Sequence, residues 1–362
     1  MSIWKNNTMI WPANWKAIAY NDNIGKEHNF MTTISTGDVI SFRVDEGANN
    51  AMIQQYGTQQ VSTNNTLTLQ GIRIRDPYII SDVETKTYYL FGTTDSEPWF
   101  GKGEGFLVYQ SKDLAEWTNL GYAFTPDQNF WAEKNFWAPE VHHYGNAFYM
   151  LASFYAEGKC RGVQTLRSKD IQGPYVPLTD KAVTPSDWEC LDGTLYVDEE
   201  ETPWIIFSHE WTQIQDGAIC LAKLSKDLTA MVSEPIVLFH ASEAPWSVAN
   251  TGDVIQKEGK NYVTDGPFLF KAANGELKML WSSFSKTGYS IGVASSQSGQ
   301  ITGPWVQAEE PFYKNNGGHG MLFQTFEGAL KLAMHTPNES PEERAVFLSV
   351  VDDKELGLRC IG

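Results

Sequence analysis

Cysteine is scarce in this chain, and its placement excludes two common structural uses. The 362 residues include 4 cysteines, which are widely scattered and show no C-x-x-C spacing. Zinc knuckles and disulfide scaffolds depend on closely spaced cysteines, so neither is predicted. We expect the thiols to be reduced and mostly buried.

Long apolar runs and helical periodicity are also missing. Residues 1–7 lack the basic start and apolar stretch of a signal peptide, and no segment approaches the length of a membrane span. We therefore expect a cytoplasmic protein that does not engage a membrane. Helical periodicity is weak throughout, which disfavours a parallel α/β fold.

Positive charge is in short supply. Lysine and arginine total 27 against 44 aspartates and glutamates, which gives a net charge of -17. Such a chain repels phosphate backbones and anionic lipids, so nucleic acid is a poor partner candidate and a neutral substrate fits better. Aromatic residues reach 13%, with 13 tryptophans. Aromatic faces suit either sugar binding or core packing.

One pattern recurs five times along the chain: a polar residue, a short apolar strand, a tight turn and a second apolar strand. The copies begin at Asp76, Glu140, Asp192, Asp265 and His319. Their starts lie about 50 to 75 residues apart, which is the size of a four-stranded propeller blade. Asn274-Gly275 and Glu327-Gly328 are hairpin signals between the strands of the last two copies.

A second marker, Ser-Lys-Asp, follows the first three hairpins. It begins at Ser111, Ser168 and Ser225, and a weaker copy begins at Ser295. Serine and aspartate bind nearby backbone in turns, so we interpret the marker as the turn between the outer strands of each blade. The sequence therefore predicts an all-β fold, a five-bladed β-propeller with four-stranded antiparallel blades around a central funnel.

Residues 1–66 do not match the repeat, although residues 39–44 have the pattern of a strand. We expect residues 1–66 to form an N-terminal extension that either flanks the propeller or supplies a strand that closes the ring. Residues 67–362 are expected to form the catalytic propeller.

The first residue of each copy should face the shared axis, because the innermost strand of a blade begins there. Four of the five are acidic. Clustered buried carboxylates are costly, and carboxyl pairs with different pKa values are the usual means of cleaving glycosidic bonds. Taken singly, Asp192-Gly193 and Asp265-Gly266 could equally be turn dipeptides. The complete set favours a glycosidase site.

An ordered set of motifs carries a family resemblance over roughly residues 70–350. It comprises Arg75-Asp76-Pro77, Trp137-Ala138-Pro139-Glu140, Asp192, Asp265-Gly266-Pro267 and Gly318-His319-Gly320. The set resembles glycoside hydrolase family 43, whose members are five-bladed propellers that hydrolyse α-L-arabinofuranosides, β-D-xylosides or related galactofuranosides with inversion. The resemblance implies that Asp76 is the general base and that Asp192 orients the acid and adjusts its pKa. It also implies that His319 lies on the axis, where calcium or another ion is often held through water, although the chemistry itself needs no cofactor.

The proton donor is the point at which this chain departs from the commonest family pattern, because Asp265 stands where the family usually has glutamate. One methylene less shortens the reach by about 1.5 Å, and a donor must lie within about 2.6–3.2 Å of the glycosidic oxygen. Glu210, at the end of the second strand of blade three, offers a longer carboxyl. We therefore expect Glu210 to be the donor, with Asp265 and then Glu140 as alternatives. The expected substrate contacts are Glu140, Trp137, Trp211 and His319.

Two neighbouring motifs suggest other chemistries. His209-Glu210 lacks the second histidine of a zinc-protease helix, since Gln213 takes its place. Trp188-Glu189-Cys190 resembles the acid motif of the invertase-like enzymes, which share the propeller and an Arg-Asp-Pro triplet. In those enzymes the triplet belongs to the second blade and follows an Asn-Asp-Pro motif, which this chain lacks.

The expected activity is that of an exo-acting or short-chain-acting α-L-arabinofuranosidase or β-xylosidase working on imported oligosaccharides. The alternatives are a β-galactofuranosidase or fructan-acting relative, and a catalytically silent sugar-binding propeller.

Overall fold

The computed structural model describes residues 2–5, 8–11, 40–43, 66–250, 260–355 and 357–361. The chain divides into two units, Met1–Asn65 and Thr66–Gly362. In the first unit, a three-stranded sheet has the order β2-β1-β3. Its strands are β1 (Ser2–Lys5), β2 (Thr8–Trp11) and β3 (Ile40–Arg43), the last of which lies where the sequence predicts a strand.

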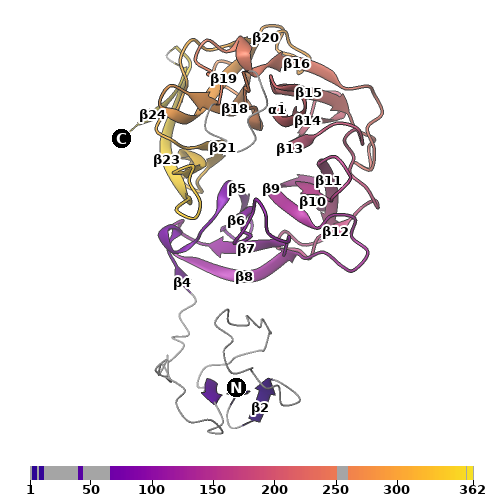
Figure 1. The fold of residues 1–362 in the computed structure, drawn as a ribbon. Helices are drawn as coiled ribbons and strands as arrows, with labels where there is room; N and C mark the ends of the chain where they lie inside the picture. The colour runs from indigo at the N-terminus through magenta and orange to yellow at the C-terminus, as the bar shows by residue number, and fades with distance from the viewer. Residues whose placement is uncertain are drawn as a thin grey trace. The chain divides into compact units, whose positions relative to one another are not determined.

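The second unit is a five-bladed β-propeller, as predicted: five antiparallel sheets follow one another in a ring (Figure 1). Blade 1 contains β5 (Arg75–Asp82), β6 (Thr87–Thr93), β7 (Phe106–Ser111), β8 (Trp117–Phe124) and the short edge strand β4 (Thr66–Leu67). Blade 2 contains β9 (Lys134–Tyr144), β10 (Ala147–Tyr155), β11 (Gly162–Ser168) and β12 (Val176–Pro177). Blade 3 contains β13 (Cys190–Val197), β14 (Pro203–His209), β15 (Ala218–Lys223) and β16 (Ile236–His240).

Blade 4 contains β17 (Asp265–Lys271), β18 (Leu277–Ser285), β19 (Gly288–Ser296) and β20 (Trp305–Gln307). Blade 5 contains β21 (Gly318–Gln324), β22 (Leu330–Thr336), β23 (Arg344–Asp353) and β24 (Gly357–Ile361). The helical turns among the described residues are η1 (Leu69–Gly71), α1 (Trp211–Ile214) and η2 (Ala241–Glu243). None of the described helices has the length and apolar character needed to cross a membrane.

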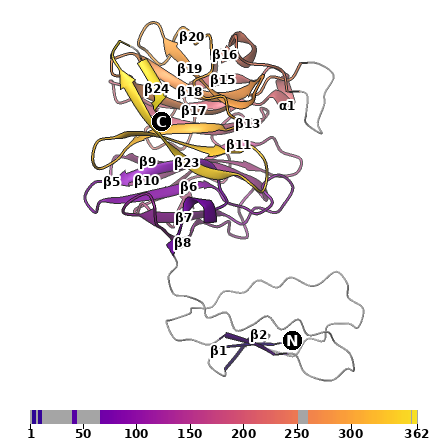
Figure 2. The same cartoon turned by 90° about the vertical axis from the view of Figure 1, so that its left-hand side faces the viewer.

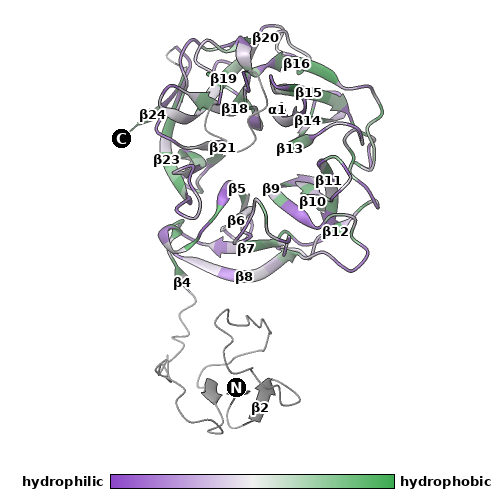
Figure 3. Cartoon of the chain, viewed as in Figure 1, coloured by the Kyte–Doolittle hydropathy of each residue, from purple (hydrophilic) through white to green (hydrophobic). Residues whose placement is uncertain are grey.

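The core lies between the faces of neighbouring blades. Trp204 and Ile206 of blade 3, for example, belong to the same buried cluster as Trp281 of blade 4. Because a blade packs on both faces, its second strand is apolar almost throughout, and β6 and β14 are buried at every position. Figure 3 shows the corresponding pattern, with hydrophobic colour on the strands and hydrophilic colour on most of the loops between them.

The Ser-Lys-Asp marker forms the turn between the third and fourth strands, as predicted. In blade 1, Ser111 Oγ accepts a hydrogen bond from the Leu114 amide at 2.8 Å, and Asp113 Oδ1 accepts one from the Glu116 amide at 2.9 Å. Leu114 itself is left-handed, with φ 65°. The side chains thus satisfy the backbone of a tight turn that has no ladder partner.

The ring closes where blade 5 meets blade 1. Strands β21 and β22 contact β5, and Figures 1 and 2 place the yellow and indigo blades side by side. Arg73, just before β5, forms a bridge with Arg344 of β23, and the Ile74 amide donates to Glu343 O at 3.4 Å. The closure brings the first strands of all five blades together around one axis.

Candidate active site

The innermost strand of every blade carries a bulge at which one residue is left-handed, and β9 has a second left-handed residue, Asn135, with φ 51°. The φ values are 52° at Asp76, 46° at Ala138, 54° at Asp192, 50° at Gly266 and 50° at His319. At each point the pairing with the second strand shifts register. A non-glycine residue in this region costs about 1–2 kcal/mol. Four such residues in one ring therefore require compensating contacts.

Side chains of the preceding blade hold the strained amides. The bonds are Ala138 N to Thr93 Oγ1 (2.8 Å), Asp192 N to Ser153 Oγ (2.9 Å), His319 N to Ser282 Oγ (2.8 Å) and Asp76 N to His335 Nδ1 (3.2 Å). The other four partners lie in second strands, whereas the Gly266 amide donates to Oδ2 of a first-strand residue, Asp192, at 3.0 Å. Ser208, at the corresponding position of β14, has a buried hydroxyl without a hydrogen-bond partner. One carboxylate oxygen of Asp192 is thereby bound to the backbone of blade 4.

The bulges show that two of the acidic residues are not equivalent to the others. Glu140 lies beyond Ala138 in the interior of β9, and Asp265 precedes Gly266. The expected common register therefore holds for Asp76, Asp192 and His319 but not for Glu140 and Asp265. A bulge adds one residue to a strand, so aligning the polar residues by sequence could not detect these offsets.

Asp76 has the surroundings of an ionised carboxylate. Its Oδ2 accepts a hydrogen bond from Thr93 Oγ1 at 2.7 Å, and its Oδ1 lies 3.2 Å from His319 Nδ1. Burial alone would raise the pKa of Asp76, but His319, His335 and Arg75 together lower that pKa well below its usual value. The carboxylate is therefore ionised across the neutral range, which is the protonation state that a general base requires.

Asp192 and His319 share the axis with Asp76. Asp192 Oδ2 lies 3.5 Å from His319 Nδ1. Burial raises the pKa of Asp192 to about 8, with the charges of Asp265 and Asp76 adding to this effect and His319 opposing it. Burial would lower the pKa of His319, but Asp76 and Asp192 raise it to about 10. His319 is thus a cation between two carboxyl groups, of which Asp192 keeps its proton more readily.

Asp265 has an intermediate pKa. The Tyr289 hydroxyl donates to Asp265 Oδ2 at 2.9 Å. Burial raises the pKa of Asp265 to about 6, although the Tyr289 hydrogen bond and the charge of His319 both oppose it. A carboxyl group with this pKa is partly protonated near neutral pH, which is the behaviour of a general acid.

Tyr289→Phe should move the pH profile if Asp265 donates the proton. The variant removes a hydrogen bond to the carboxylate and leaves burial unchanged, so we expect the pKa of Asp265 to rise by about one unit. The alkaline limb of kcat/KM should then shift to higher pH by a similar amount. Tyr313→Phe, whose hydroxyl contacts Asn315 O at 3.4 Å, is the control and should leave the profile in place. An unmoved limb in Tyr289→Phe would exclude Asp265 as the donor.

Glu210 follows β14 directly and occupies the N-cap position of the short helix α1, where its side chain makes no capping hydrogen bond. Its carboxylate forms an ion pair with Arg161 Nη1, and Glu189 Oε2 lies 4.0 Å from the same nitrogen. The charge of Glu210 is one of the influences that raise the pKa of Asp265. Arginine is permanently charged, and Glu210 therefore stands in this structure as the anionic half of an ion pair.

Trp137 belongs to a layer in which two tryptophan side chains lie between two arginine side chains. The Arg161 guanidinium lies 4.5 Å from the Trp137 ring centroid, Trp137 meets Trp99 edge-on at 5.1 Å, and the Arg75 guanidinium lies 4.9 Å from the Trp99 ring. Trp137 Nε1 also donates to Pro98 O at 2.6 Å. Since Trp99 is 42% exposed, the layer reaches solvent and offers aromatic surface beside the acidic groups.

Glu140 and Trp211 are both buried. Glu140 Oε2 lies 3.2 Å from His142 Nε2, and the Tyr78 hydroxyl lies 3.5 Å from His142 Nδ1. The charge of Glu140 is a further influence that raises the pKa of His319. Contact of Glu140, Trp137, Trp211 or His319 with a sugar stays a prediction.

A cation near His319 likewise stays a prediction. Nδ1 of His319 faces Asp76 and Asp192. Across the part of the chain that the structure describes, no group of three or more His, Cys, Asp or Glu side chains is arranged to hold a metal ion. These residues do not fit direct coordination by three protein ligands, so an ion at this position would depend on other ligands such as water.

Sequence reasoning missed Arg161, Tyr289 and Thr93. Apart from Glu210 and Trp211 after the second strand of blade 3, it considered only first strands. Thr93, however, ends β6, Tyr289 lies in β19 and Arg161 precedes β11. One signal was available: a hydroxyl residue recurs near the end of the second strand in four blades. The members are Thr93, Ser153, Ser208 and Ser282.

The geometry supplies both kinds of carboxyl group that glycoside hydrolysis uses. Asp76 is held ionised, whereas burial raises the pKa of Asp192 and Asp265. All three lie at the axis of a propeller, beside exposed aromatic surface. A deprotonated base and a protonated acid in one site define the class of the protein, a glycoside hydrolase.

Comparison with known proteins agrees with this class. A model of glycosyl hydrolases family 43 matches residues 69–354, and the chain belongs to this family. An endo-arabinase from Bacteroides thetaiotaomicron VPI-5482 is 40% identical, with a TM-score of 0.72 over 79% of this chain and 97% of that chain. An endo-1,4-β-xylanase from the same organism is 24% identical, with a TM-score of 0.63 over 82% of this chain and 96% of that chain, and shares the fold.

A curated relative is more distant. The extracellular endo-α-(1→5)-L-arabinanase 1 of Bacillus subtilis (strain 168) is 25% identical over 163 residues, which are 42% of this chain and 47% of that protein. The match therefore spans about half the length of the curated relative.

Proposed function

We propose that the protein hydrolyses α-L-arabinofuranosyl linkages in short arabino-oligosaccharides and inverts the anomeric carbon. The observation that carries the substrate is the 40% identity to an endo-arabinase over 97% of that chain. The curated arabinanase supports the same sugar. A xylosyl substrate has weaker support, because the xylanase relative is similar at 24% identity only.

The proposed reaction is a single displacement. Asp76 takes a proton from water as the water oxygen bonds to the anomeric carbon. The glycosidic C–O bond breaks, and a carboxylic acid protonates the departing oxygen. Proton exchange with solvent then restores both groups.

We assign the donor role to Asp265 rather than to Glu210. The pKa of Asp265, raised to about 6, supports this choice. Glu210 is instead paired with Arg161, and this pair can bind sugar hydroxyls. Asp192, anchored by the Gly266 amide, is proposed to orient the donor and to influence its pKa.

A substrate panel tests the activity. The purified protein is assayed against nitrophenyl α-L-arabinofuranoside, β-D-xyloside, β-D-galactofuranoside and β-D-fructofuranoside, and against arabino-oligosaccharides and linear arabinan. We expect the arabinosyl substrates to be cleaved with the highest kcat/KM. Preference for another sugar would replace the proposed substrate, and binding without any cleavage would indicate a silent sugar-binding propeller.

The configuration of the first product tests inversion. An inverting enzyme should release β-arabinofuranose from an α-arabinofuranoside before mutarotation mixes the anomers. Proton NMR at early times distinguishes the two anomeric signals. An initial α product would require a covalent intermediate and would contradict a base that activates water.

A further inference from the structure

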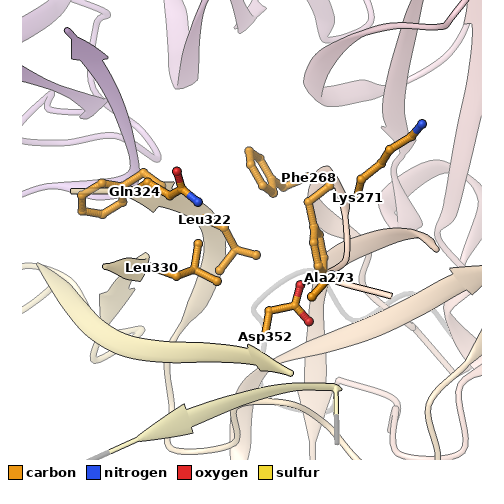
Figure 4. A pocket seen from close by; sticks show the side chains of 9 residues that line it. Phe268, Lys271, Ala273, Leu322, Gln324, Leu330 and Asp352 are labelled. Carbon is orange, nitrogen blue, oxygen red and sulfur yellow. Dashed lines mark hydrogen bonds between the residues drawn. The ribbon is translucent and has the colours of Figure 1, made fainter. Parts of the chain in front are cut away.

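A cavity lies between blades 4 and 5, with a volume of about 420 Å³. Phe268 and Phe270 of β17 and Leu322 of β21 supply apolar walls. Figure 4 shows Phe268, Leu322 and Asp352 around the opening, with Gln324 and Lys271 on opposite sides. Its size and largely apolar lining are those of a small-molecule site. We call this cavity the blade 4/5 cleft.

The blade 4/5 cleft extends away from the catalytic carboxyls. Strand β17 begins at Asp265 in the active site and ends at Lys271 in the cleft, and its seven residues of extended chain cover about 20 Å at 3.3 Å per step. The wall nearest the active site consists of Phe268 and Leu322, which follow Asp265 and His319 by three residues, or about 10 Å. The cleft therefore occupies the far half of both strands and does not include the catalytic carboxyls.

Asp352 provides an unused hydrogen-bond acceptor. Its Oδ2 accepts a hydrogen bond from the Ala273 amide at 2.6 Å, whereas its Oδ1 is buried and has no hydrogen-bond partner. An unsatisfied buried acceptor costs about 1–3 kcal/mol. Oδ1 is enclosed in this structure, so a ligand hydroxyl reaches it only when the Asp352 side chain turns toward the cleft. The exposed Gln324 amide offers a polar contact at the rim without such a movement.

The charges at the blade 4/5 cleft favour a neutral ligand. Lys271 and Asp352 both line it and have opposite charges. Lys271 Nζ is also paired with Glu199 at 2.5 Å. The Lys271 ammonium repels a cationic amine that would bind on the phenylalanine rings, and the Asp352 carboxylate repels an anionic ligand. A sugar ring is neutral, has apolar C–H faces for the phenylalanine rings, and carries hydroxyl donors for Asp352.

From these contacts we infer that the blade 4/5 cleft is a second carbohydrate site that binds an arabino-oligosaccharide away from the catalytic centre. The sugar identity rests on the proposed function, whereas the presence of a neutral-sugar site rests on the cleft alone. A second site of this kind would keep a longer chain or a neighbouring branch attached while the active site turns over.

The test counts bound sugars in the full chain. Arabinotriose and xylotriose are titrated separately into Asp76→Asn by calorimetry, and we expect two sites for arabinotriose. Gln324→Trp, which fills the cleft, and Asp352→Asn, which replaces the carboxylate, should each abolish one site or weaken it at least tenfold in the Asp76→Asn background. Glu327→Ala is the control, because Glu327 is exposed in the nearby turn but does not line the cleft.

Turnover separates failure of this site from failure of the proposed function. In the wild-type background, Gln324→Trp and Asp352→Asn should keep kcat/KM for nitrophenyl arabinofuranoside within about twofold. One site in Asp76→Asn, or two sites that persist in both cleft variants, would overturn the inference even if arabinosides are cleaved. If both cleft variants lose a sugar site but the wild type cleaves no arabinoside, the sugar site in the cleft is supported and the proposed function is rejected. Binding of benzyltrimethylammonium in the cleft, with neither sugar binding there, would also overturn the inference.

Discussion

Asp76→Asn is expected to lower kcat by about 10³–10⁴-fold while the protein stays folded and binds sugar. An amide cannot accept a proton from the attacking water, so the loss should appear in kcat rather than in KM. The fold should survive because an asparagine amide has nearly the same size and shape as the carboxylate. Its oxygen can still accept the hydrogen bond from Thr93 Oγ1.

The measurements are steady-state kinetics, thermal unfolding and calorimetric binding of arabinotriose. Asp82→Asn is a matched control, because Asp82 lies at the other end of the same strand and caps a turn through Thr85. It should retain near-wild-type kcat. Turnover of Asp76→Asn within tenfold of wild type would exclude Asp76 as the base. An unfolded variant would instead assign Asp76 a structural role.

Removing the proton donor should cause a loss of activity that depends on the leaving group of the substrate. A dinitrophenolate departs without protonation, whereas a sugar alkoxide does not. If Asp265 is the donor, Asp265→Asn should lower kcat/KM about 10³-fold for arabinotriose and less than about tenfold for dinitrophenyl arabinofuranoside. The pKa of Asp265 is raised to about 6, so wild-type activity should fall as pH rises through this value, and the variant should lose that alkaline limb.

For Glu210→Gln we expect the opposite result in the same assay, a loss of activity that does not depend on the leaving group. Because Glu210 is paired with Arg161, the variant should lower kcat/KM to a similar extent for both substrates, mainly by raising KM. Asp227→Asn, in the exposed turn of blade 3, is the control and should change neither substrate. A leaving-group-dependent loss in Glu210→Gln, with Asp265→Asn affecting both substrates equally, would assign the donor to Glu210.

The two donor candidates illustrate how far sequence reasoning reaches. The sequence motifs identified Asp265 and Glu210 as the two candidates. Side-chain length, considered alone, favoured the longer glutamate as the proton donor. The ion pair between Glu210 and Arg161 argues against Glu210 as the donor. Arg161 lies in a different blade and reaches Glu210 only after blades 2 and 3 have packed. A pKa depends on such neighbours and on burial, and neither can be read from a motif.

The five-bladed propeller could be derived from sequence because its causes are local. Apolar strands, hairpin turns such as Asn274-Gly275 and the Ser-Lys-Asp turns recur along the chain, and each acts over a few residues. The same repeat indicated that Asp76, Asp192 and His319 share an axis. Tertiary structure decided the rest: the bulges that displace Glu140 and Asp265 from that register, the hydroxyls that hold the strained amides, and the pKa differences among the carboxyls. These features arise from contacts between blades, where burial and neighbouring charges act on groups far apart in the chain.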